Sequence, residues 1–395
     1  MSAPYRARRD RLAASIGEGV VLVRGAGSEG KVSSNFFYLT GLAEPRGVLL
    51  LFPEGAWVRQ ARMPGSDYLK GRHVTSAMFL PPSDPLKRRW GEDGVATLDS
   101  ETAKGLGVDS LLAAADLPAV LTAVLERTPA LSIVRGAPPD LERGSVDDTF
   151  VAQVQDRLFG VSLRDATSAA TALRMTKSDD EIAAIARAAD ITAEAFAAAR
   201  AAARPGMAEH EVEAELARVY RSHGATHAFG PIVASGGRAN VLHYRDNDAR
   251  ILDGQLLLVD SGASLDGYGA DVTRTWRPGG EPSPRQREVL DAVQAAQAAA
   301  IDVCRPGRTL DDVHRVAHAA LTDAGFGHAF PHGTSHHLGL ETHDPADVHV
   351  PLAPNMVITV EPGVYLDDEE IGVRIEDDVR IRDGEPEILT RAIPK

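Results

Sequence analysis

Apolar and polar positions follow two periodicities in the first 160 residues. Short apolar runs predict strands, namely GVVLVRG at 19–25, NFFYLTG at 35–41, GVLLLFPEGAWV at 47–58 and LSIVRG at 131–136. Amphipathic stretches predict helices at 4–16, at about 109–126 and at about 147–158. Strands that alternate with helices in this way are typical of an α/β domain.

The pattern changes to that of one long helix after residue 165. Ser178 precedes an Ala-rich amphipathic stretch, and Glu181 follows three positions later, which is the signature of a capping box. This helix is expected to run to about residue 203. The length of 395 residues also favours two domains. We therefore expect an α/β domain at residues 1–170 and a second domain at residues 171–395.

An internal repeat with an offset of 101 residues organises the second domain. RPGMAEHEV at 204–212 resembles RPGRTLDDV at 305–313. The same offset aligns three further pairs, namely Gly224 with Gly325, His227-Ala228-Phe229 with His328-Ala329-Phe330, and Val259-Asp260 with Val360-Glu361. A constant offset at four separate places predicts a duplicated helix-helix-strand-strand unit. Equivalent residues of the two copies are then expected to meet at a pseudo-two-fold axis.

The first copy ends in a predicted hairpin, QLLLVDSGASLDGYGADVTRTW, that presents two carboxylates. A turn at Leu265-Asp266 would place Asp260 directly opposite Asp271. A turn at Asp266-Gly267 would make the two residues diagonal neighbours. Both registers put the carboxylates on one face, because side chains alternate along a strand.

The second copy repeats this design in MVITVEPGVYLDDEEIGVRIEDDVRI. Glu361 and Glu376 share a face, and the loop is expected to be four residues longer than in the first hairpin. Paired like charges need a cation between them. Four carboxylates and one imidazole from HGTSHHLGLETHD at 332–344 suit two divalent ions, and oxygen-rich ligation favours Mn²⁺, with Co²⁺ or Zn²⁺ as alternatives.

The composition of the chain argues against some classes of binding partner and indicates a cellular compartment. The net charge of -14 argues against a nucleic-acid partner. No apolar run is long enough to span a membrane, and no apolar core of a signal peptide follows the charged start of the chain. Cys304 is the single cysteine, so an internal disulfide is excluded. We therefore expect a cytoplasmic protein.

Four motifs, VDSGA…ADVTRTW, HGTSHHLGLETHD, VEPGVY and GVRIEDD, occur in this order. Over about residues 170–395 the sequence resembles the pita-bread metallopeptidases, which include aminopeptidase P, prolidase and methionine aminopeptidase. NFFYLTGLAEP and RRWGED resemble the N-terminal domain of aminopeptidase P and some prolidases. The resemblance implies an N-terminal α/β domain before a pita-bread catalytic domain, a homodimer, and a peptide substrate with proline at the second position.

The same resemblance assigns roles to individual residues. It implies five metal ligands, namely Asp260, Asp271, His336, Glu361 and Glu376. Asp271 and Glu376 would bridge two ions, and Glu361 would be the general acid and base. His243 resembles a substrate-binding histidine near the proline pocket, and His343 resembles a histidine that stabilises the tetrahedral intermediate or passes a proton. Further candidates for substrate contact are His332, Arg374 and Tyr365, and Arg374 is also a candidate for pairing with a ligand carboxylate. His337 is expected to point away.

Four interpretations of the activity stay open. A Xaa-Pro aminopeptidase and a Xaa-Pro dipeptidase differ in whether the peptide continues beyond proline, and a dipeptidase needs a basic group for the dipeptide carboxylate. Arg374 and arginines of the first domain are candidates for that group. A broad-specificity aminopeptidase of the same fold would not require proline. A non-catalytic pita-bread module would only bind peptides, and the five intact ligands favour an active enzyme.

Overall fold

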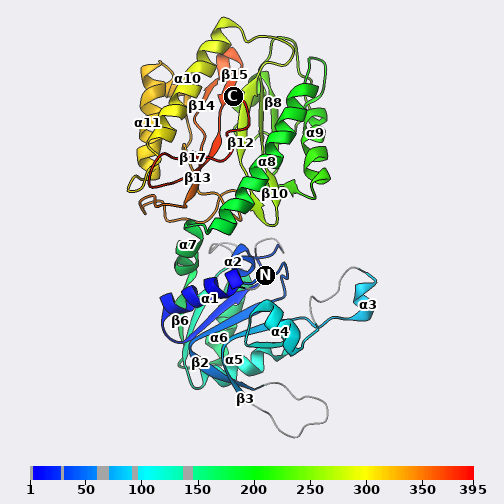
Figure 1. Cartoon of the computed structure of the whole chain (residues 1–395), viewed down its shortest axis with the longest axis vertical. Coiled ribbons are helices and arrows are strands. Elements are labelled where there is room, and N and C mark those ends of the chain that lie inside the picture. The colour runs from blue at the N-terminus through cyan, green and yellow to red at the C-terminus, as the bar shows by residue number, and fades with distance from the viewer. Residues whose placement is uncertain (1–2, 28–30, 60–70, 91–96, 137–145) are drawn as a thin grey trace. The chain divides into compact units, whose positions relative to one another are not determined.

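The computed structural model describes residues 3–27, 31–59, 71–90, 97–136 and 146–395 (Figure 1). The chain forms two compact units, Met1–Leu173 and Arg174–Lys395. Helix α7 (Thr167–Met175) runs across this division. The end of the RRWGED motif, residues 91–93, lies outside the described residues. None of the helices in the described part of the chain is long and apolar enough to cross a membrane.

The first unit is a mixed six-stranded sheet in the order β4-β3-β2-β1-β5-β6. Strand β1 pairs antiparallel with β2 and parallel with β5, and its buried Val20 and Leu22 contribute to the core of this unit. The strands are β1 (Val20–Arg24), β2 (Val48–Arg59), β3 (Gly71–Leu80), β4 (Ser110–Ala113), β5 (Ala130–Val134) and β6 (Ser162–Asp165). The helices are α1 (Ala3–Ile16), α2 (Ser34–Thr40), α3 (Pro85–Arg88), α4 (Ser100–Leu106), α5 (Leu117–Leu125) and α6 (Val146–Arg157).

Two predictions for the first unit are wrong. NFFYLTG forms helix α2 and not a strand, because Ser33 caps its N-terminus and Gly41 ends it in the left-handed conformation with φ 71°. The predicted helix at 109–126 begins with strand β4, which pairs in parallel with β3, and continues through the 3-10 turn η2 (Ala114–Asp116) into α5. Strands β3 and β6 were not predicted.

The second unit contains the predicted duplication. Its helices are α8 (Asp179–Ala202), α9 (Glu209–Ser222), α10 (Pro284–Asp302) and α11 (Leu310–Asp323). The pair α8 and α9 flanks the strands on one side, and the pair α10 and α11 flanks them on the other (Figure 1). The capping box of Ser178 and Glu181 at the start of α8 is confirmed. Matching glycines have matching positive φ angles, 89° at Gly206 and 85° at Gly307.

The strands of the second unit form short sheets in both copies of the repeat. Strands β12-β9-β8 and β11-β10-β7 belong to the first copy, and β13-β16-β17 and β14-β15 belong to the second. The first copy contains β7 (Thr226–His227), β8 (Ile232–Ser235), η3 (Gly236–Asn240), β9 (Leu257–Ser261), β10 (Ala263–Leu265), β11 (Tyr268–Gly269) and β12 (Val272–Trp276). The second contains η4 (Gly327–Ala329), β13 (Val357–Val360), β14 (Gly363–Leu366), η5 (Asp367–Glu369), β15 (Ile371–Arg374), β16 (Asp377–Arg380) and β17 (Glu387–Ile388).

The first hairpin has the diagonal register. Leu265 pairs with Tyr268, so the turn consists of Asp266 and Gly267, whose φ angles are 53° and 87°. These angles are those of a tight hairpin turn that favours the Asp-Gly sequence. Asp260 lies opposite Thr273, and Asp271 is therefore its diagonal neighbour. At Gly262 the strands approach so closely that a Cβ atom would lie 1.7 Å from the carbonyl oxygen of Ala270.

The second hairpin has the direct register. Leu366 pairs with Ile371 and Val360 pairs with Asp377, so the register places Glu361 opposite Glu376. Four residues, 367–370, join the paired strands, whereas two residues join them in the first hairpin. The prediction of a loop longer by four is therefore wrong: the loop is longer by two, and the change from diagonal to direct pairing accounts for the remaining two positions.

Hydrogen bonds and a buried ion pair join the two hairpins. The backbone N–H of Glu376 donates to the carbonyl oxygen of Thr273 at 3.0 Å, and the hydroxyl of Thr275 donates to the carbonyl oxygen of Arg374 at 3.0 Å. Arg274 and Asp377 form an ion pair at 2.7 Å with both side chains buried. Strand β12 of one copy therefore lies beside the β15 and β16 segment of the other, which brings the carboxylates of both copies together.

Candidate metal centre and substrate cavity

One cavity of about 410 Å³ lies in the second unit where the two copies of the repeat meet. Nine of the ten candidate residues line it, namely His243, Asp260, Asp271, His332, His336, His343, Glu361, Arg374 and Glu376. The tenth, Tyr365, lies beside the cavity and bonds two of its lining residues. The registers of the two hairpins and the position of the histidine segment therefore place most of the candidate residues in the wall of one cavity.

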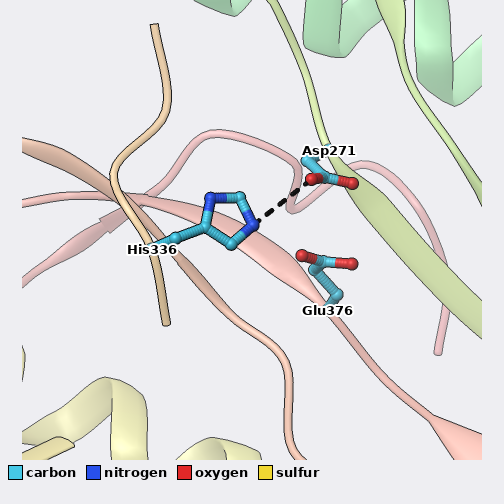
Figure 2. A group of neighbouring side chains, drawn as sticks. All are labelled: Asp271, His336 and Glu376. Atoms are coloured by element: carbon cyan, nitrogen blue, oxygen red, sulfur yellow. Dashed lines mark ion pairs between the residues drawn. The ribbon is translucent and has the colours of Figure 1, made fainter. Parts of the chain in front are cut away.

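Three of these side chains form the tightest cluster of ligand atoms. One nitrogen of His336 and one oxygen each of Asp271 and Glu376 all lie within 4.8 Å of one another. Figure 2 shows the imidazole of His336 directed toward the two carboxylates, which come from the two different hairpins. The Nε2 atom of His336 lies 3.5 Å from Asp271 Oδ2 and 3.5 Å from Glu361 Oε1.

The backbone around His336 fixes which ring nitrogen faces the carboxylates. The segment runs beside β13, where the N–H of Thr359 donates to the carbonyl oxygen of His336 at 2.9 Å. Nδ1 of His336 lies 3.1 Å from the carbonyl oxygen of His337, so Nδ1 carries the proton and donates it there. In the neutral form of this ring, Nε2 is then the nitrogen with the free lone pair, which is the tautomer that a metal ligand needs.

Burial and mutual repulsion act on the carboxylates. Burial, followed by the negative charge of Asp260, raises the pKa of Asp271 well above its usual range. Burial, followed by the charge of Asp271, does the same to the pKa of Glu376. Burial also raises the pKa of Glu361 to about 7. A bound cation would offset both the desolvation and the repulsion, so the donor set fits divalent metal ions.

Arg374 compensates part of this negative charge. Its Nη2 donates to Asp260 Oδ2 at 2.6 Å, and its Nε donates to the hydroxyl of Thr273 at 3.1 Å. That hydroxyl donates in turn to Glu376 Oε2 at 2.7 Å. The second oxygen of Asp260, Oδ1, is buried and has no hydrogen-bond partner among the described residues. A buried acceptor without a donor is costly, and a metal ion would supply the missing interaction.

Comparison with known proteins identifies the family. Residues 183–383 match metallopeptidase family M24, and residues 5–133 match the N-terminal domain of aminopeptidase P. The Xaa-Pro aminopeptidase of Haemophilus influenzae is 31% identical over 92% of this chain and 85% of its own length. The chain belongs to metallopeptidase family M24. A divalent metal ion is the cofactor that both the family and the cluster of Asp271, His336 and Glu376 support.

Solved structures of aminopeptidase P have the same architecture as this metallopeptidase. A putative aminopeptidase P from Bacillus anthracis superposes with a TM-score of 0.89 at 27% identity, covering 100% of this chain and 96% of the other. Escherichia coli aminopeptidase P with the inhibitor Pro-Leu superposes with a TM-score of 0.84 at 26% identity, again covering 100% and 96%. The likeness therefore extends over both units of the metallopeptidase.

The remaining histidines of the metallopeptidase differ in their surroundings. The ring of His343 is perpendicular to that of His336 with 4.2 Å between centroids. Burial lowers the pKa of His343. His343 is therefore neutral at pH 7 and has one donor and one acceptor nitrogen. His337 does not line the cavity: it is buried and forms a β-bridge with Ile358.

His332 belongs to a chain of hydrogen bonds that begins at Arg374. Nη1 of Arg374 donates to the hydroxyl of Tyr365 at 3.0 Å, and that hydroxyl lies 2.9 Å from Nε2 of His332. The other ring nitrogen of His332 lies 2.8 Å from the carbonyl oxygen of Gly333, to which it donates. Burial lowers the pKa of His332 to about 4, so this ring is neutral and accepts the hydrogen bond from Tyr365.

Sequence reasoning missed several residues at this site. Thr273 links Arg374 to Glu376, and its position was available in the sequence, because it lies opposite Asp260 in the diagonal register. Asp378 accepts a hydrogen bond from the backbone N–H of Asp271 at 3.2 Å. Its signal was the doubled acid in GVRIEDD, which was used only as a motif.

A buried ion cluster holds the segment that carries His336 and His343, and it was also missed. Asp344 accepts from Arg174 at 2.6 Å and from Lys177 at 3.3 Å, with all three side chains buried. The backbone N–H of Asp344 donates to the carbonyl oxygen of His337 at 2.9 Å, which closes the loop between them. No local pattern could reveal a contact between residues that are 167 and 170 positions apart.

Proposed function

We propose that the chain is a dinuclear metallo-exopeptidase that hydrolyses the bond between an N-terminal residue and proline. The observation that carries this proposal is the convergence in a single cavity of four carboxylates and one imidazole whose Nε2 faces two of them. The likeness to Xaa-Pro aminopeptidases supports the reaction and the preference for proline, because it covers 92% of the chain at 31% identity.

The proposed ligands of two divalent ions are Asp260, Asp271, His336, Glu361 and Glu376. The proximity of Asp271 and Glu376 supports a bridging position for both, since they come from opposite hairpins and share the cluster with His336. The donor set has oxygens and one nitrogen but no thiolate, and this supports Mn²⁺ as the ion, with Co²⁺ and Zn²⁺ as alternatives. Metal analysis of protein reconstituted with each ion would measure the stoichiometry.

The roles of the chain's own groups follow from their placement. When bound, two divalent ions would lower the pKa of a water molecule and polarise the scissile carbonyl. Glu361 lies at the cavity wall 3.5 Å from His336, and we assign to its carboxylate the removal of the water's proton and its delivery to the leaving nitrogen. We assign the stabilisation of the tetrahedral intermediate to neutral His343, which lines the same cavity.

Proline at the second position sets a particular requirement. The nitrogen of the bond before proline has no N–H group, so it cannot donate a hydrogen bond and must be protonated before it leaves. Recognition must then rest on the shape of the ring. His243 and His332 line the cavity together with the apolar side chains of Phe229 and Leu242, and these four residues are our candidates for the proline pocket.

Longer peptides are the substrates that we favour over dipeptides. Escherichia coli aminopeptidase P has been solved with the inhibitor Pro-Leu, in which a residue follows proline. This chain resembles that protein over its whole length, which supports a cavity that accepts residues beyond proline. A Xaa-Pro dipeptidase and a broad-specificity aminopeptidase are the alternatives.

One set of substrates separates these alternatives. Mn²⁺-loaded protein is assayed with Ala-Pro, Ala-Pro-Ala and Ala-Ala-Ala. Cleavage of Ala-Pro-Ala but not Ala-Ala-Ala is the expected result. Cleavage of Ala-Pro alone would indicate a dipeptidase, and equal cleavage of both tripeptides would indicate a broad aminopeptidase. No cleavage with Mn²⁺, Co²⁺ or Zn²⁺ would contradict an enzymatic function and favour a peptide-binding module.

The mechanism has a sharper test in Glu361→Gln. Because a positioned acid or base contributes about 10²–10⁴-fold to the rate, we expect kcat to fall by that factor or more. Glu370→Gln is the matched control, since Glu370 belongs to the exposed loop of the same hairpin. Circular dichroism and metal content distinguish loss of chemistry from loss of fold or of ions. Full activity in Glu361→Gln would exclude the assigned role.

Assembly and compartment complete the proposal. We propose a cytoplasmic homodimer, which the resemblance to aminopeptidase P and the single buried cysteine support. Light scattering coupled to size-exclusion chromatography would measure the mass of the assembly. The proposed binding partner of the protein is its peptide substrate. The strongly negative net charge supports neither a nucleic acid nor a membrane surface as a further partner.

A further inference from the structure

Two guanidinium groups line the cavity, and they differ in what they bind. Arg374 is buried and donates to Asp260, Thr273 and Tyr365. Arg245 is exposed and forms no hydrogen bond or ion pair with any described residue. Arg245 is therefore the positive charge in the cavity wall that is available to a ligand.

The backbone on both sides of Arg245 is firmly anchored. Tyr244 does not line the cavity, and its hydroxyl donates to the buried carboxylate of Glu209 at 2.8 Å. The side chain of Asn247 accepts from the N–H of Val233 at 2.9 Å. Both anchors lie within two positions of Arg245, so the base of this long side chain is held at the wall of the cavity. His243, on the other side of Tyr244, also lines the cavity.

The guanidinium group of Arg245 has a defined resting place. It lies against Gly230, where a Cβ atom would come within 2.8 Å of its Nη1. Gly230 follows Phe229, which lines the cavity. The exposed side chain of Arg245 and the buried carboxylates of Asp271 and Glu376 place this cation toward the solvent side of the cavity.

This position matches a charge that short substrates carry. An exopeptidase holds the N-terminal residue at the reacting centre, so the rest of the peptide extends toward solvent. In a tripeptide the C-terminal carboxylate lies two residues beyond the scissile bond, at most about 7 Å away along the chain. The interior of the cavity is acidic and disfavours that carboxylate, whereas a guanidinium group binds carboxylates with two parallel hydrogen bonds.

We propose that Arg245 is a specificity-determining residue that binds the C-terminal carboxylate of short peptides. This inference rests on the proposed function, since it assumes that peptides occupy the cavity with their N-termini at the metal centre. Arg245 makes the enzyme favour peptides that end within one or two residues of proline and that have a free carboxylate. Longer peptides, whose carboxylate lies farther away, gain nothing from this contact.

The first test measures binding without turnover. Calorimetry is used to titrate the Mn²⁺-loaded full chain with Pro-Leu and with Pro-Leu amide, which lacks the terminal charge. We expect the wild type to bind Pro-Leu about threefold to tenfold more tightly than the amide, as for a partly exposed charge-assisted pair. Arg245→Gln should bind both equally, and Arg245→Lys should keep part of the preference. Arg238→Gln is the matched control, because Arg238 is exposed but does not line the cavity.

The second test measures the same preference in KM. With Ala-Pro-Ala and its C-terminal amide, Arg245→Gln should raise KM for the free acid to the value for the amide. It should leave kcat unchanged, since Arg245 does not contact the reacting atoms. The inference is overturned if the wild type does not bind Pro-Leu, if it binds both ligands equally, or if Arg245→Gln keeps the preference. Binding that depends on Arg245 without any cleavage would refute the proposed function and leave this inference standing.

Discussion

The two hairpins of the second unit come from one repeated design, yet they present their carboxylates differently. In the first, Asp260 and Asp271 are diagonal neighbours across a two-residue turn. In the second, Glu361 and Glu376 lie in directly opposed positions across a four-residue loop. The two halves therefore supply equal numbers of carboxylates, but not from equivalent positions.

This difference limits the number of buried carboxylates where the two copies of the repeat meet. Thr273 and Glu376 occupy corresponding positions, each opposite the acid that the repeat aligns. A glutamate at 273 would bring a fifth carboxylate to a site where burial and repulsion already raise the pKa values of three. Thr273 instead donates its hydroxyl proton to Glu376. One half of the repeat thus supports a ligand candidate of the other half.

The imidazole adds a second asymmetry. In the second half, a segment beside β13 carries His336, which turns Nε2 toward Asp271 and Glu361. In the first half, strand β8 pairs with β9, and Ile232 lies opposite Asp260. In the same pairing Ala234 lies opposite Leu258, which is the position that His336 has opposite Thr359, so an apolar residue in the first copy takes the place of the imidazole in the second. The cluster of ligand atoms is consequently built around the second copy.

The largest expected effect comes from removing one charge of the second hairpin. In Glu376→Gln the proposed bridging carboxylate becomes an amide, which is a weak ligand and cannot balance the charge of two ions. We expect the metal content of the reconstituted protein to fall below two ions per chain and activity to fall by at least about 10²-fold, the lower limit for a lost catalytic group. Elemental analysis would measure the stoichiometry. Unchanged content and activity would mean that the halves do not share their ions through Glu376.

Thr273→Val tests the supporting role of the first hairpin. The change removes the hydroxyl that accepts from Arg374 and donates to Glu376, while it keeps the shape of the side chain. Loss of a group that orients a ligand typically lowers metal affinity about 10–100-fold. Competition with a chelator would measure this, and Thr273→Ser, which keeps the hydroxyl, should retain nearly normal affinity. Equal affinities in the two variants would show that Thr273 only fills space.

Removal of metal should lower the stability of the protein, because the carboxylates of the two hairpins then repel one another without a cation between them. The folded pKa values of Asp271, Glu361 and Glu376 are raised above the unfolded value of about 4. Their contribution to stability is therefore complete below about pH 4 and is lost as the pH rises through the folded values, which for Glu361 is about 7.

The measurement that checks this is a thermal melt across pH. We expect the Tm of chelator-treated protein to fall between pH 5 and pH 8. Addition of Mn²⁺ at about 100 times its Kd should raise the Tm by roughly 5–10 °C, since such saturation is worth about 2.7 kcal/mol. The increase should be larger at pH 8 than at pH 5. A metal-free Tm that rises with pH would contradict the assigned pKa directions.

The smallest expected effect lies in the first turn. Gly267 has a φ of 87°, which costs a residue with a side chain about 1–2 kcal/mol. Gly267→Ala should lower the free energy of unfolding by about 1 kcal/mol in urea denaturation, with activity nearly intact. Asp266→Asn is the control, because Asn also tolerates the left-handed conformation at that position. A large loss of activity in Gly267→Ala would mean that the turn sets the diagonal register.

Sequence alone predicted the parts of the fold that local rules determine. The capping box of Ser178 fixed the start of α8, and the 101-residue offset predicted the duplication. The helix α2 was predicted as a strand, because its aromatic run has a high strand propensity that the caps at Ser33 and Gly41 override. Strand β4 was missed because its four residues become a strand only through pairing with β3.

In the candidate site, too, local sequence rules predicted some features, and contacts between distant residues determined the others. The alternation of strand side chains and the repeat predicted the four carboxylates, and the family resemblance supplied the other five candidates that line the same cavity. The supporting contacts could not be predicted, because they join residues far apart in the chain. Lys177 and Asp344 are separated by 167 positions, and for Arg374 the sequence predicted a pairing with a ligand carboxylate but not its partner Asp260, 114 positions away. Tyr365 was predicted as a substrate contact, and it lies beside the cavity with its hydroxyl bonded to Arg374, nine positions away, and to His332, 33 positions away.

The close approach at Gly262 has a genetic consequence. A single added methyl group would lie 1.7 Å from the carbonyl oxygen of Ala270 and would force apart the strands that carry Asp260 and Asp271. In a library that samples every codon under selection for activity, alanine at 262 should be as rare as a lost carboxylate. A residue with no side chain and no part in the chemistry would then rank among the least replaceable in the gene.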